Sequence, residues 1–174
     1  MDYDVVVIGG GPAGYSLALS CQSNGLNSLL IEKEPHLDGV CLHMGCIPSK
    51  TLLHATEHTT VTPHALMQKK EKVVNTLSQG LDTLFSVKKI NRLTAHASVV
   101  NPHTVKVLHE GHEKIISAKN IVLATGSQPI ELPFLPFDEV QVVSSTGALN
   151  IEHIPESLVV IGAGVIGVEL ASVY

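Results

Sequence analysis

The sequence predicts an α/β protein built on a parallel sheet, and three observations lead to this fold class. Residues 4–8 (DVVVI) form a run of β-branched apolar residues, which is typical of a strand buried on both faces. A glycine turn, GGGPAG, follows, and an apolar-periodic stretch up to Asn24 predicts a helix that ends at Gly25. Residues 28–32 (SLLIE) complete a strand–helix–strand unit.

Composition supports a folded core and excludes several functions. The 174 residues are 44% hydrophobic and 16% charged, and the net charge is −5. This balance favours a buried core over disorder, and one arginine, Arg92, makes no basic surface for nucleic acid. No apolar run has the length of a membrane span, and no secretory leader precedes the first strand. We therefore expect a cytoplasmic protein with no membrane or nucleic-acid partner.

The middle of the chain predicts two helices and several short strands. Pro48 suits the first turn of a helix over about 47–59. Apolar residues spaced three and four apart predict a second helix over about 64–85. The strands expected after it, a small antiparallel meander and then another buried strand, are 93–100, 104–108, 113–117 and 120–126.

A second unit of the same kind starts near the end of the sequence. Residues 158–174 (LVVIGAGVIGVELASVY) predict a strand, a glycine turn and the first part of a helix. Three prolines make 128–139 an extended linker, with a domain boundary just after it. We therefore expect a first domain over 1–140, a linker over 141–157 and the truncated start of a second domain over 158–174.

Three glycines of the first turn, Gly9, Gly11 and Gly14, have the G-x-G-x-x-G spacing between a strand and a helix. The first permits a tight turn, the second lets backbone approach a pyrophosphate, and the third lets helix and strand pack closely. The helix N-terminus offers N–H groups to phosphates. Glu32 ends the next strand, where a carboxylate can accept hydrogen bonds from ribose hydroxyls. This context predicts a Rossmann-like dinucleotide site; the alternative is a turn that only serves packing.

The same glycine spacing occurs again at Gly162, Gly164 and Gly167. Glu169 lies inside the helix that follows this second turn, so it is a candidate binding residue there but is not the carboxylate that would bind the ribose. Two such turns in one chain predict two dinucleotides. A flavin with a nicotinamide, FAD with NAD, is the simplest combination.

Cys41 and Cys46 lie close together in GVCLHMGCIPSK, residues 39–50, and several kinds of site compete for them. A structural zinc site needs four ligands, and neither Cys21 nor the scattered histidines supply the rest, so we expect no metal. The iron–sulfur spacing fails because residue 49 is serine. A structural disulfide across so short a loop would constrain little of the unfolded chain.

The favoured interpretation is a redox-active pair. Cys46 lies where Pro48 begins a helix, and the positive end of the helix dipole together with Lys50 favours a thiolate there. Gly45 gives the backbone the freedom to bring both cysteines within disulfide reach. Cys41, on the preceding loop, is freer to exchange with a substrate disulfide.

Together these segments resemble the class I pyridine nucleotide-disulfide oxidoreductases. GVCLHMGCIPSK is similar to their redox-active segment, and the likeness covers nearly all of the chain through VVVIGGGPAGY, IVLATGS, VSSTGAL and VVIGAGVIGVELASVY. Within this family the segment looks most like dihydrolipoamide dehydrogenase. Glutathione and mercuric reductases usually carry valines where this chain has Leu42 and Ile47.

The resemblance implies a flavin-dependent enzyme that oxidises dihydrolipoamide with NAD through the cysteine pair. Cys46 is then the thiol nearest the flavin, Cys41 the interchange thiol, and Lys50 approaches the flavin ring. Backbone near His96 and Ala97 meets the adenine. The candidate cofactor-binding residues are Gly9, Gly11, Pro12, Ala13, Gly14, Glu32, Lys33, Gly39, Val40, Lys50, Ala97, Thr125, Gly126, Ser127, Gly162, Gly164, Val165, Ile166, Gly167 and Glu169.

The resemblance also implies partners and further parts. Family members run to well over twice this length, form homodimers and receive dihydrolipoamide on the lipoyl domains of 2-oxo acid dehydrogenase complexes. Their histidine–glutamate base, which acts across the dimer, has no match here, so we expect the chain alone to be incomplete as an enzyme. A related disulfide or mercuric reductase and an inactive FAD-binding or assembly module are the alternatives.

Asp38 departs from the family, which usually has glycine at this position. A carboxylate near the pyrophosphate would repel it, and a side chain could block close backbone approach.

Overall fold

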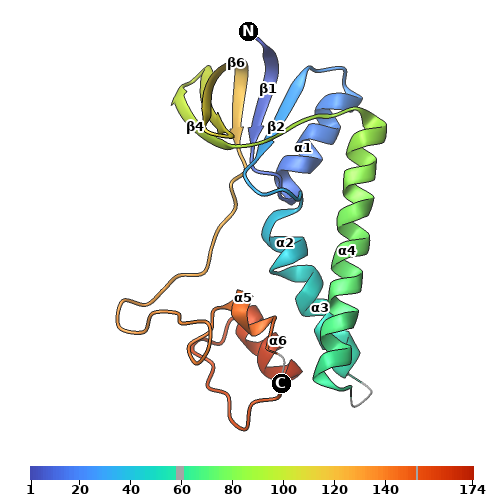
Figure 1. Ribbon diagram of the computed structural model, residues 1–174, viewed down its shortest axis with the longest axis vertical. Helices are drawn as coiled ribbons and strands as arrows, with labels where there is room; N and C mark the ends of the chain where they lie inside the picture. Colours follow the sequence, from blue (N-terminus) through green and yellow to red (C-terminus); the bar gives the residue numbers. More distant parts are fainter. Residues whose placement is uncertain (58–60, 152) are drawn as a thin grey trace. The chain divides into compact units, whose positions relative to one another are not determined.

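The computed structural model describes residues 1–57, 61–151 and 153–174 (Figure 1). These residues form two compact units: Met1–Gly39 with Ser78–Gly126, and Val40–Leu77 with Ser127–Tyr174. The division reflects contacts within this chain, so the domain bounds expected from the sequence stay a prediction.

The first unit is a six-stranded sheet that is parallel on one side and antiparallel on the other. Its strands have the order β3-β2-β1-β6-β5-β4. β1 pairs with β2 and β6 in parallel and β2 pairs with β3 in parallel, whereas β4, β5 and β6 form an antiparallel meander. This arrangement confirms the predicted combination of a parallel sheet and a meander. The strands are β1 (Tyr3–Ile8), β2 (Ser28–Glu32), β3 (Asn91–Thr94), β4 (His96–Asn101), β5 (Thr104–His109) and β6 (His112–Leu123).

The strand bounds correct two predictions. The strands expected at 113–117 and 120–126 are one strand, β6, which pairs with β5 up to Ser117 and with β1 from Ala118 onward. The single strand expected over 93–100 is two, because the chain changes partner: residues up to Thr94 pair with β2, and residues from His96 onward pair with β5. β3 therefore joins the parallel sheet and β4 joins the meander.

Apolar side chains on both faces of β1 explain why its sequence is an unbroken hydrophobic run. Val6 and Ile8 face the meander and pack in one cluster with Val105 and Ile116. Val5 and Val7 face the other way and pack in a cluster with helix α1 (Pro12–Ser23) and with Phe85 of helix α4 (Pro63–Lys88). Burial on both faces is the parallel-sheet pattern that the sequence predicted.

The second unit is helical. It contains α3 (Cys46–Thr56), the first part of α4, α5 (Ser145–Ala148) and α6 (Val165–Val173). Leu52, Leu66 and Leu170 are buried together in its core. Between the two units in sequence, α2 (Gly39–His43) forms where the sequence analysis expected a loop. The helix predicted over about 47–59 corresponds to α3, and its predicted end near residue 59 lies outside the described residues.

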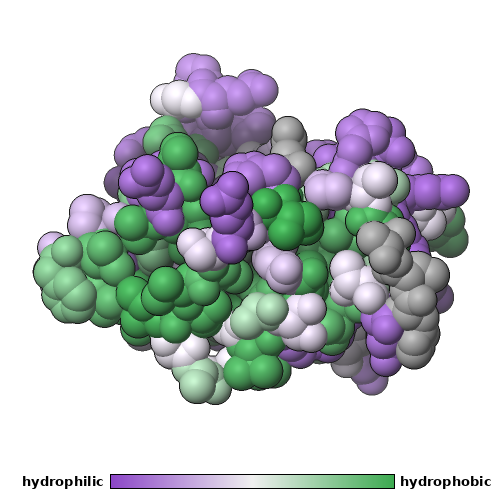
Figure 2. Space-filling view, turned by 90° about the horizontal axis from the view of Figure 1, so that it is seen from below, coloured by the Kyte–Doolittle hydropathy of each residue, from purple (hydrophilic) through white to green (hydrophobic). Residues whose placement is uncertain are grey.

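Residues 158–161 correct the prediction of a strand at the start of the second glycine turn. They have no strand structure, and Val159 is 87% exposed. A strand needs a neighbouring strand to complete its backbone hydrogen bonds, and none pairs with 158–161 in the described part of the chain. Leu158, Val160 and Ile161 are also exposed, so the segment presents apolar side chains at the surface. Hydrophobic residues gather on the face that Figure 2 shows.

Candidate functional site

The first glycine loop follows β1, an inner strand of the sheet, at the carboxyl ends of the parallel strands. The loop after β1 leads through α1 to β2 on one side, whereas β6 lies on the other side of β1 (Figure 1). Ala124, just after β6, donates its amide to the Ile8 carbonyl at 2.8 Å. The carboxyl ends of parallel strands are the edge at which open α/β sheets bind ligands.

The three glycines of the motif differ in what surrounds them. Gly9 has a φ of 108°, and a Cβ there would stand 2.6 Å from the carbonyl carbon of Ala124. A Cβ on Gly14 would stand 2.9 Å from the carbonyl carbon of Gly9 and closer still to its oxygen. A Cβ on Gly11 would meet nothing within 4 Å. The protein's own packing therefore requires Gly9 and Gly14, while Gly11 borders open space.

The start of α1 can receive an anion. Its N-cap is Gly11, and no side chain caps the first turn, in which Pro12 and Ala13 are exposed. The N–H groups of a first turn have no partner inside the helix, and the helix dipole adds a partial positive charge. The turn therefore fits a phosphate beside Gly11.

Glu32 is the last residue of β2 and holds a carboxylate beside this loop. It is only 8% exposed, and its Oε2 accepts the Gly10 amide at 2.6 Å. Its Oε1 accepts the amide of Glu34 at 2.9 Å. Both oxygens are thus fixed by backbone donors, which places the predicted ribose acid at the edge of the glycine loop.

The segment after β2 closes over the loop. Asp38 donates its amide to the Gly10 carbonyl at 2.7 Å, and a Cβ on Gly39 would stand 3.2 Å from the Cα of Gly11. Both residues have a positive φ, 95° for Asp38 and 54° for Gly39. Lys33, by contrast, is exposed in a surface ion pair with Glu34.

The other cofactor residues predicted for this unit follow β6 or lie on the meander. A Cβ on Gly9 would stand 3.0 Å from the Thr125 amide nitrogen, so Thr125 begins beside the loop. Gly126 has a φ of 72° and is exposed with its neighbour Ser127. Ala97 lies half-buried on β4. The binding roles of these residues stay predictions.

Two cysteines, Cys41 and Cys46, lie on either side of a tight connection. Cys46 is the first residue of α3 and is exposed, and Gly45 is the N-cap. Cys41 lies in α2, which corrects its expected place on a loop. A Cβ on Gly45 would stand 2.8 Å from the Val40 carbonyl oxygen and 3.4 Å from the Cα of Cys41. Glycine at 45 therefore lets the start of α3 approach the backbone of Cys41, as the sequence analysis expected.

Helix α3 is bonded to α6 through Glu169. The Glu169 carboxylate pairs with the Lys50 ammonium and accepts the Ser49 hydroxyl at 2.7 Å. These two donors, the Lys50 hydrogen bond first, hold the pKa of Glu169 below its ordinary value. The sequence predicts Lys50 and Glu169 as separate cofactor-binding residues and gives no sign that their side chains meet. The sequence did carry one signal for this contact: Glu169 is the single acidic residue in the helix VIGVELASV, and a charged side chain among apolar ones is usually paired.

The second glycine loop repeats the local geometry of the first. Gly162 has a φ of 103°, and a Cβ on Gly167 would stand 2.8 Å from the Gly162 carbonyl oxygen. Gly164 is the N-cap of α6 without a side-chain cap, and a Cβ on it would meet nothing within 4 Å. Val165 and Ile166, in the first turn of α6, are exposed. The loop therefore has the same local backbone as the first glycine loop, although no strand of the described residues leads directly into it.

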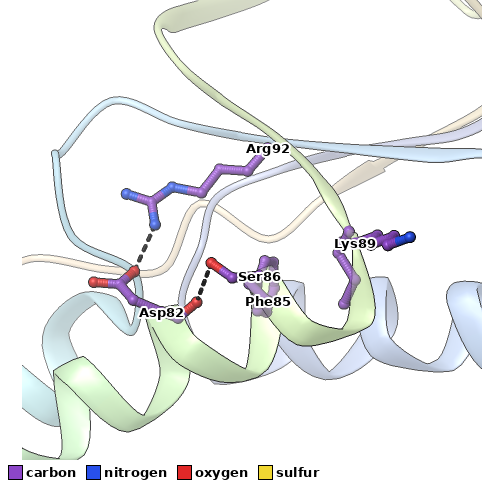
Figure 3. Close-up of a pocket in the computed structure, with 6 residues that line it drawn as sticks. Asp82, Phe85, Ser86, Lys89 and Arg92 are labelled. Atoms are coloured by element: carbon purple, nitrogen blue, oxygen red, sulfur yellow. Dashed lines mark hydrogen bonds and ion pairs between the residues drawn. The ribbon is translucent and has the colours of Figure 1, made fainter.

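A shallow pocket outside these residues lies where α4 ends and β3 begins (Figure 3). Arg92 points to Asp82, whose Oδ1 accepts its Nη1 at 2.6 Å, and it also donates to the Pro35 carbonyl. Arg92 thus ties α4 to the segment that closes over the first glycine loop. Among the described residues, no three His, Cys, Asp or Glu side chains group as metal ligands, and no helix is long and apolar enough to cross a membrane.

Comparison with known proteins gives consistent matches over almost the whole chain. A family model for pyridine nucleotide-disulphide oxidoreductases matches residues 3–174. The dihydrolipoyl dehydrogenase of Trypanosoma brucei brucei is 46% identical over 99% of this chain and 40% of its own length. The leghemoglobin reductase of Glycine max is 42% identical over 98% of this chain and 36% of its own length.

Solved structures agree with these matches. The HOCl-induced flavoprotein disulfide reductase RclA from Escherichia coli superposes with a TM-score of 0.87 at 33% identity, covering 98% of this chain and 39% of that one. The chain therefore spans about 40% of the length of the proteins that it matches. Because the family match includes both glycine loops and the cysteine pair, the chain belongs to the pyridine nucleotide-disulphide oxidoreductase family.

Proposed function

We propose that this chain forms the FAD-binding part and the redox-active dithiol of a dihydrolipoyl dehydrogenase, which oxidises dihydrolipoamide with NAD. The observation that carries the proposal is the pair of cysteines brought together by the close backbone approach at Gly45, with Cys46 at the start of α3. Relatives named dihydrolipoyl dehydrogenase, 46% identical in Trypanosoma brucei brucei and 40% in Manduca sexta, support the choice of substrate.

The two glycine loops fit the two nucleotides of this reaction. Gly9 to Gly14 and the uncapped start of α1 would hold the diphosphate of FAD, and Glu32 would hold a ribose. Gly162 to Gly167 would hold the diphosphate of NAD in the same way. Bound FAD would supply two-electron transfer between the dithiol and the nicotinamide.

The cysteine pair would exchange electrons with the substrate by thiol–disulfide exchange. One thiolate of dihydrolipoamide attacks the Cys41 sulfur of the oxidised pair, which breaks the disulfide and releases Cys46 as a thiolate. The second substrate thiolate then displaces Cys41 and closes the lipoamide disulfide. The substrate loses two electrons and two protons, and the pair gains the two electrons as two thiolates.

A base must take the substrate protons, because thiolates and not thiols are the nucleophiles. The resemblance places this base in a part of the enzyme outside these 174 residues, on the partner of a homodimer. The homodimer and the lipoyl domains of 2-oxo acid dehydrogenase complexes as carriers of the substrate are therefore part of the proposal.

The dithiol function can be tested by counting thiols. The reduced protein is exposed to lipoamide or to glutathione disulfide, and free thiols and protein mass are followed with time. Lipoamide should oxidise Cys41 and Cys46 to a disulfide and leave Cys21, which is 3% exposed, reduced. Cys46→Ser should stop intramolecular disulfide formation, and Cys21→Ser should not.

Two results would contradict the proposal. If lipoamide leaves all three thiols free, the pair is not a redox-active dithiol for this substrate. If glutathione disulfide oxidises the pair faster than lipoamide does, the alternative of a related disulfide reductase is the better assignment. The visible absorbance of the purified protein separately reports whether flavin is bound.

A further inference from the structure

Gly10, inside the first glycine loop, is held on three sides by the segment that follows β2. Its amide donates to Oε2 of Glu32 at 2.6 Å, and its carbonyl accepts the Asp38 amide at 2.7 Å. A Cβ on Gly10 would stand 2.8 Å from Cδ2 of Leu37, so the Cα of this glycine packs against the leucine side chain. The backbone of the glycine loop is therefore fixed in place by residues 32–38.

Arg92 of β3 fastens the middle of this segment. Residues 33–36 are exposed, so packing does little to fix them. The Arg92 guanidinium donates through Nη2 to the Pro35 carbonyl and through Nη1 to Oδ1 of Asp82 in α4, the latter at 2.6 Å (Figure 3). Arginine suits this place because its planar fork of donors reaches two acceptors at once. Its bond to Pro35 ties an exposed stretch of chain to α4 and β3.

We propose that Arg92 is a positioning residue of the FAD site, which fixes the first glycine loop for the diphosphate through Pro35 and Leu37. The inference rests on the proposed function, because it takes the diphosphate to bind at residues 9–14. Leu37 can pass on the position of α4, since it is 1% exposed and packs in one core cluster with Phe85. Residues that act on a site through such a chain of contacts change affinity about 2- to 30-fold.

The first test compares the FAD affinity of matched variants by titrating apo-protein and following flavin fluorescence. Arg92→Gln removes both bonds and should raise the Kd for FAD about 2- to 30-fold. The control, Asp2→Ala, also removes two hydrogen bonds of a charged group, both from Ser117, but at the other end of β1 from the glycine loop. It should leave the Kd unchanged. Asp82→Asn removes the ion pair and keeps the Arg92 bond to Pro35, so its Kd should stay close to that of the parent.

Amide hydrogen exchange reports the position of the loop without a ligand. The Asp38 amide, which donates to Gly10, is compared with the Leu26 amide, which donates to the Cys21 carbonyl at 3.0 Å beyond the far end of α1. Arg92→Gln should speed exchange at Asp38 relative to Leu26, and Asp2→Ala should not, because local opening and not global unfolding is changed. Arg92→Lys keeps the charge without the fork, so it should fall between the parent and Arg92→Gln in both measurements.

The outcomes also separate this inference from the proposed function. If Arg92→Gln binds FAD as tightly as the parent, the inference fails while the proposed function stands. If Asp2→Ala weakens binding as much as Arg92→Gln does, general destabilisation explains the loss and the inference is overturned. The same holds if Asp82→Asn has the full effect, because the ion pair and not the bond to Pro35 would then matter. If the parent does not bind FAD, the inference and the proposed cofactor site are both wrong.

Discussion

Gly11→Ala should separate ligand binding from folding at the first glycine loop. A Cβ on Gly11 would meet nothing within 4 Å, and its φ of −69° and ψ of −175° are open to alanine. Alanine is a poorer N-cap than glycine, but it also loses less chain entropy on folding, and the two effects are each up to about 1 kcal/mol. We therefore expect the free energy of unfolding to change by less than about 0.5 kcal/mol.

Nucleotide binding should respond much more strongly to the same change. The methyl group would enter the space in which a pyrophosphate approaches the backbone, and it would cost at least one hydrogen bond to a charged oxygen. Such a bond contributes about 1.5–3 kcal/mol, so the Kd for FAD should rise about 10- to 100-fold. Fluorescence titration of apo-protein with FAD measures this rise.

Gly14→Ala is the matched control because the two glycines belong to one motif and differ in what surrounds them. A Cβ on Gly14 would stand 2.9 Å from the Gly9 carbonyl carbon, and backbone on both sides limits the shift. We expect a loss of about 3 kcal/mol, at the upper end for overpacking, which lowers the urea midpoint by about 1.5 M. The reasoning is refuted if Gly11→Ala binds FAD as tightly as the parent, or if it destabilises the fold as much as Gly14→Ala.

Four other changes test contacts away from the glycine loop. Arg92→Gln should lower the free energy of unfolding by about 1–2 kcal/mol in urea denaturation, since it removes a bond to the Pro35 carbonyl and a half-exposed ion pair. The buried Lys70 ammonium donates to oxygens of Leu149 and Asn150. Lys70→Met should therefore lower the free energy of unfolding by about 1–3 kcal/mol in the same assay and speed amide hydrogen exchange near residues 149–150. Gly80 lies inside α4, and a Cβ there would meet nothing within 4 Å. Gly80→Ala should therefore raise the free energy of unfolding by about 0.5–1 kcal/mol. The pKa of Glu169 is lower in the folded protein than its ordinary value of 4.5. Its contribution to stability is therefore present above pH 4.5 and is lost as the pH falls through the pKa of the folded state. An NMR titration should show the lowered pKa, and a pKa of Glu169 at its ordinary value would contradict the pairing with Lys50.

The strands show what hydrophobic patterning can and cannot predict. β1 could be predicted because an unbroken apolar run suits burial on both faces. The continuity of β6 could not, because Lys119 and Asn120 interrupt its apolar pattern. Lys119 is accommodated by an ion pair with Asp4 of the neighbouring strand at 2.7 Å, a contact between distant parts of the sequence. Residues 158–161 show the converse, since an apolar run forms a strand only where another strand pairs with it.

The candidate site was predictable to the level of residue types but not of roles. Spacing identified the glycines of both loops, yet only the structure separates Gly14, which packing requires, from Gly11, which borders open space. In the same way, α2 could not be predicted, because five residues are too few to show a helical period. The departure at Asp38 was visible in the sequence, but its positive φ and its bond to Gly10 were not.

Within the second unit, α3, which begins at Cys46, is joined to α6, which follows the second glycine loop, by a hydrogen bond and an ion pair. Glu169 is five residues beyond Gly164, the N-cap of α6, and its carboxylate binds Ser49 and Lys50, within the first turns of the helix that begins at Cys46. Leu170, the residue after Glu169, packs in the same core as Leu52 of α3. A displacement of α6 would therefore be transmitted to α3, because the two helices share an ion pair and a core. The link explains why an acid is placed in an otherwise apolar helix, where an unpaired charge would be costly.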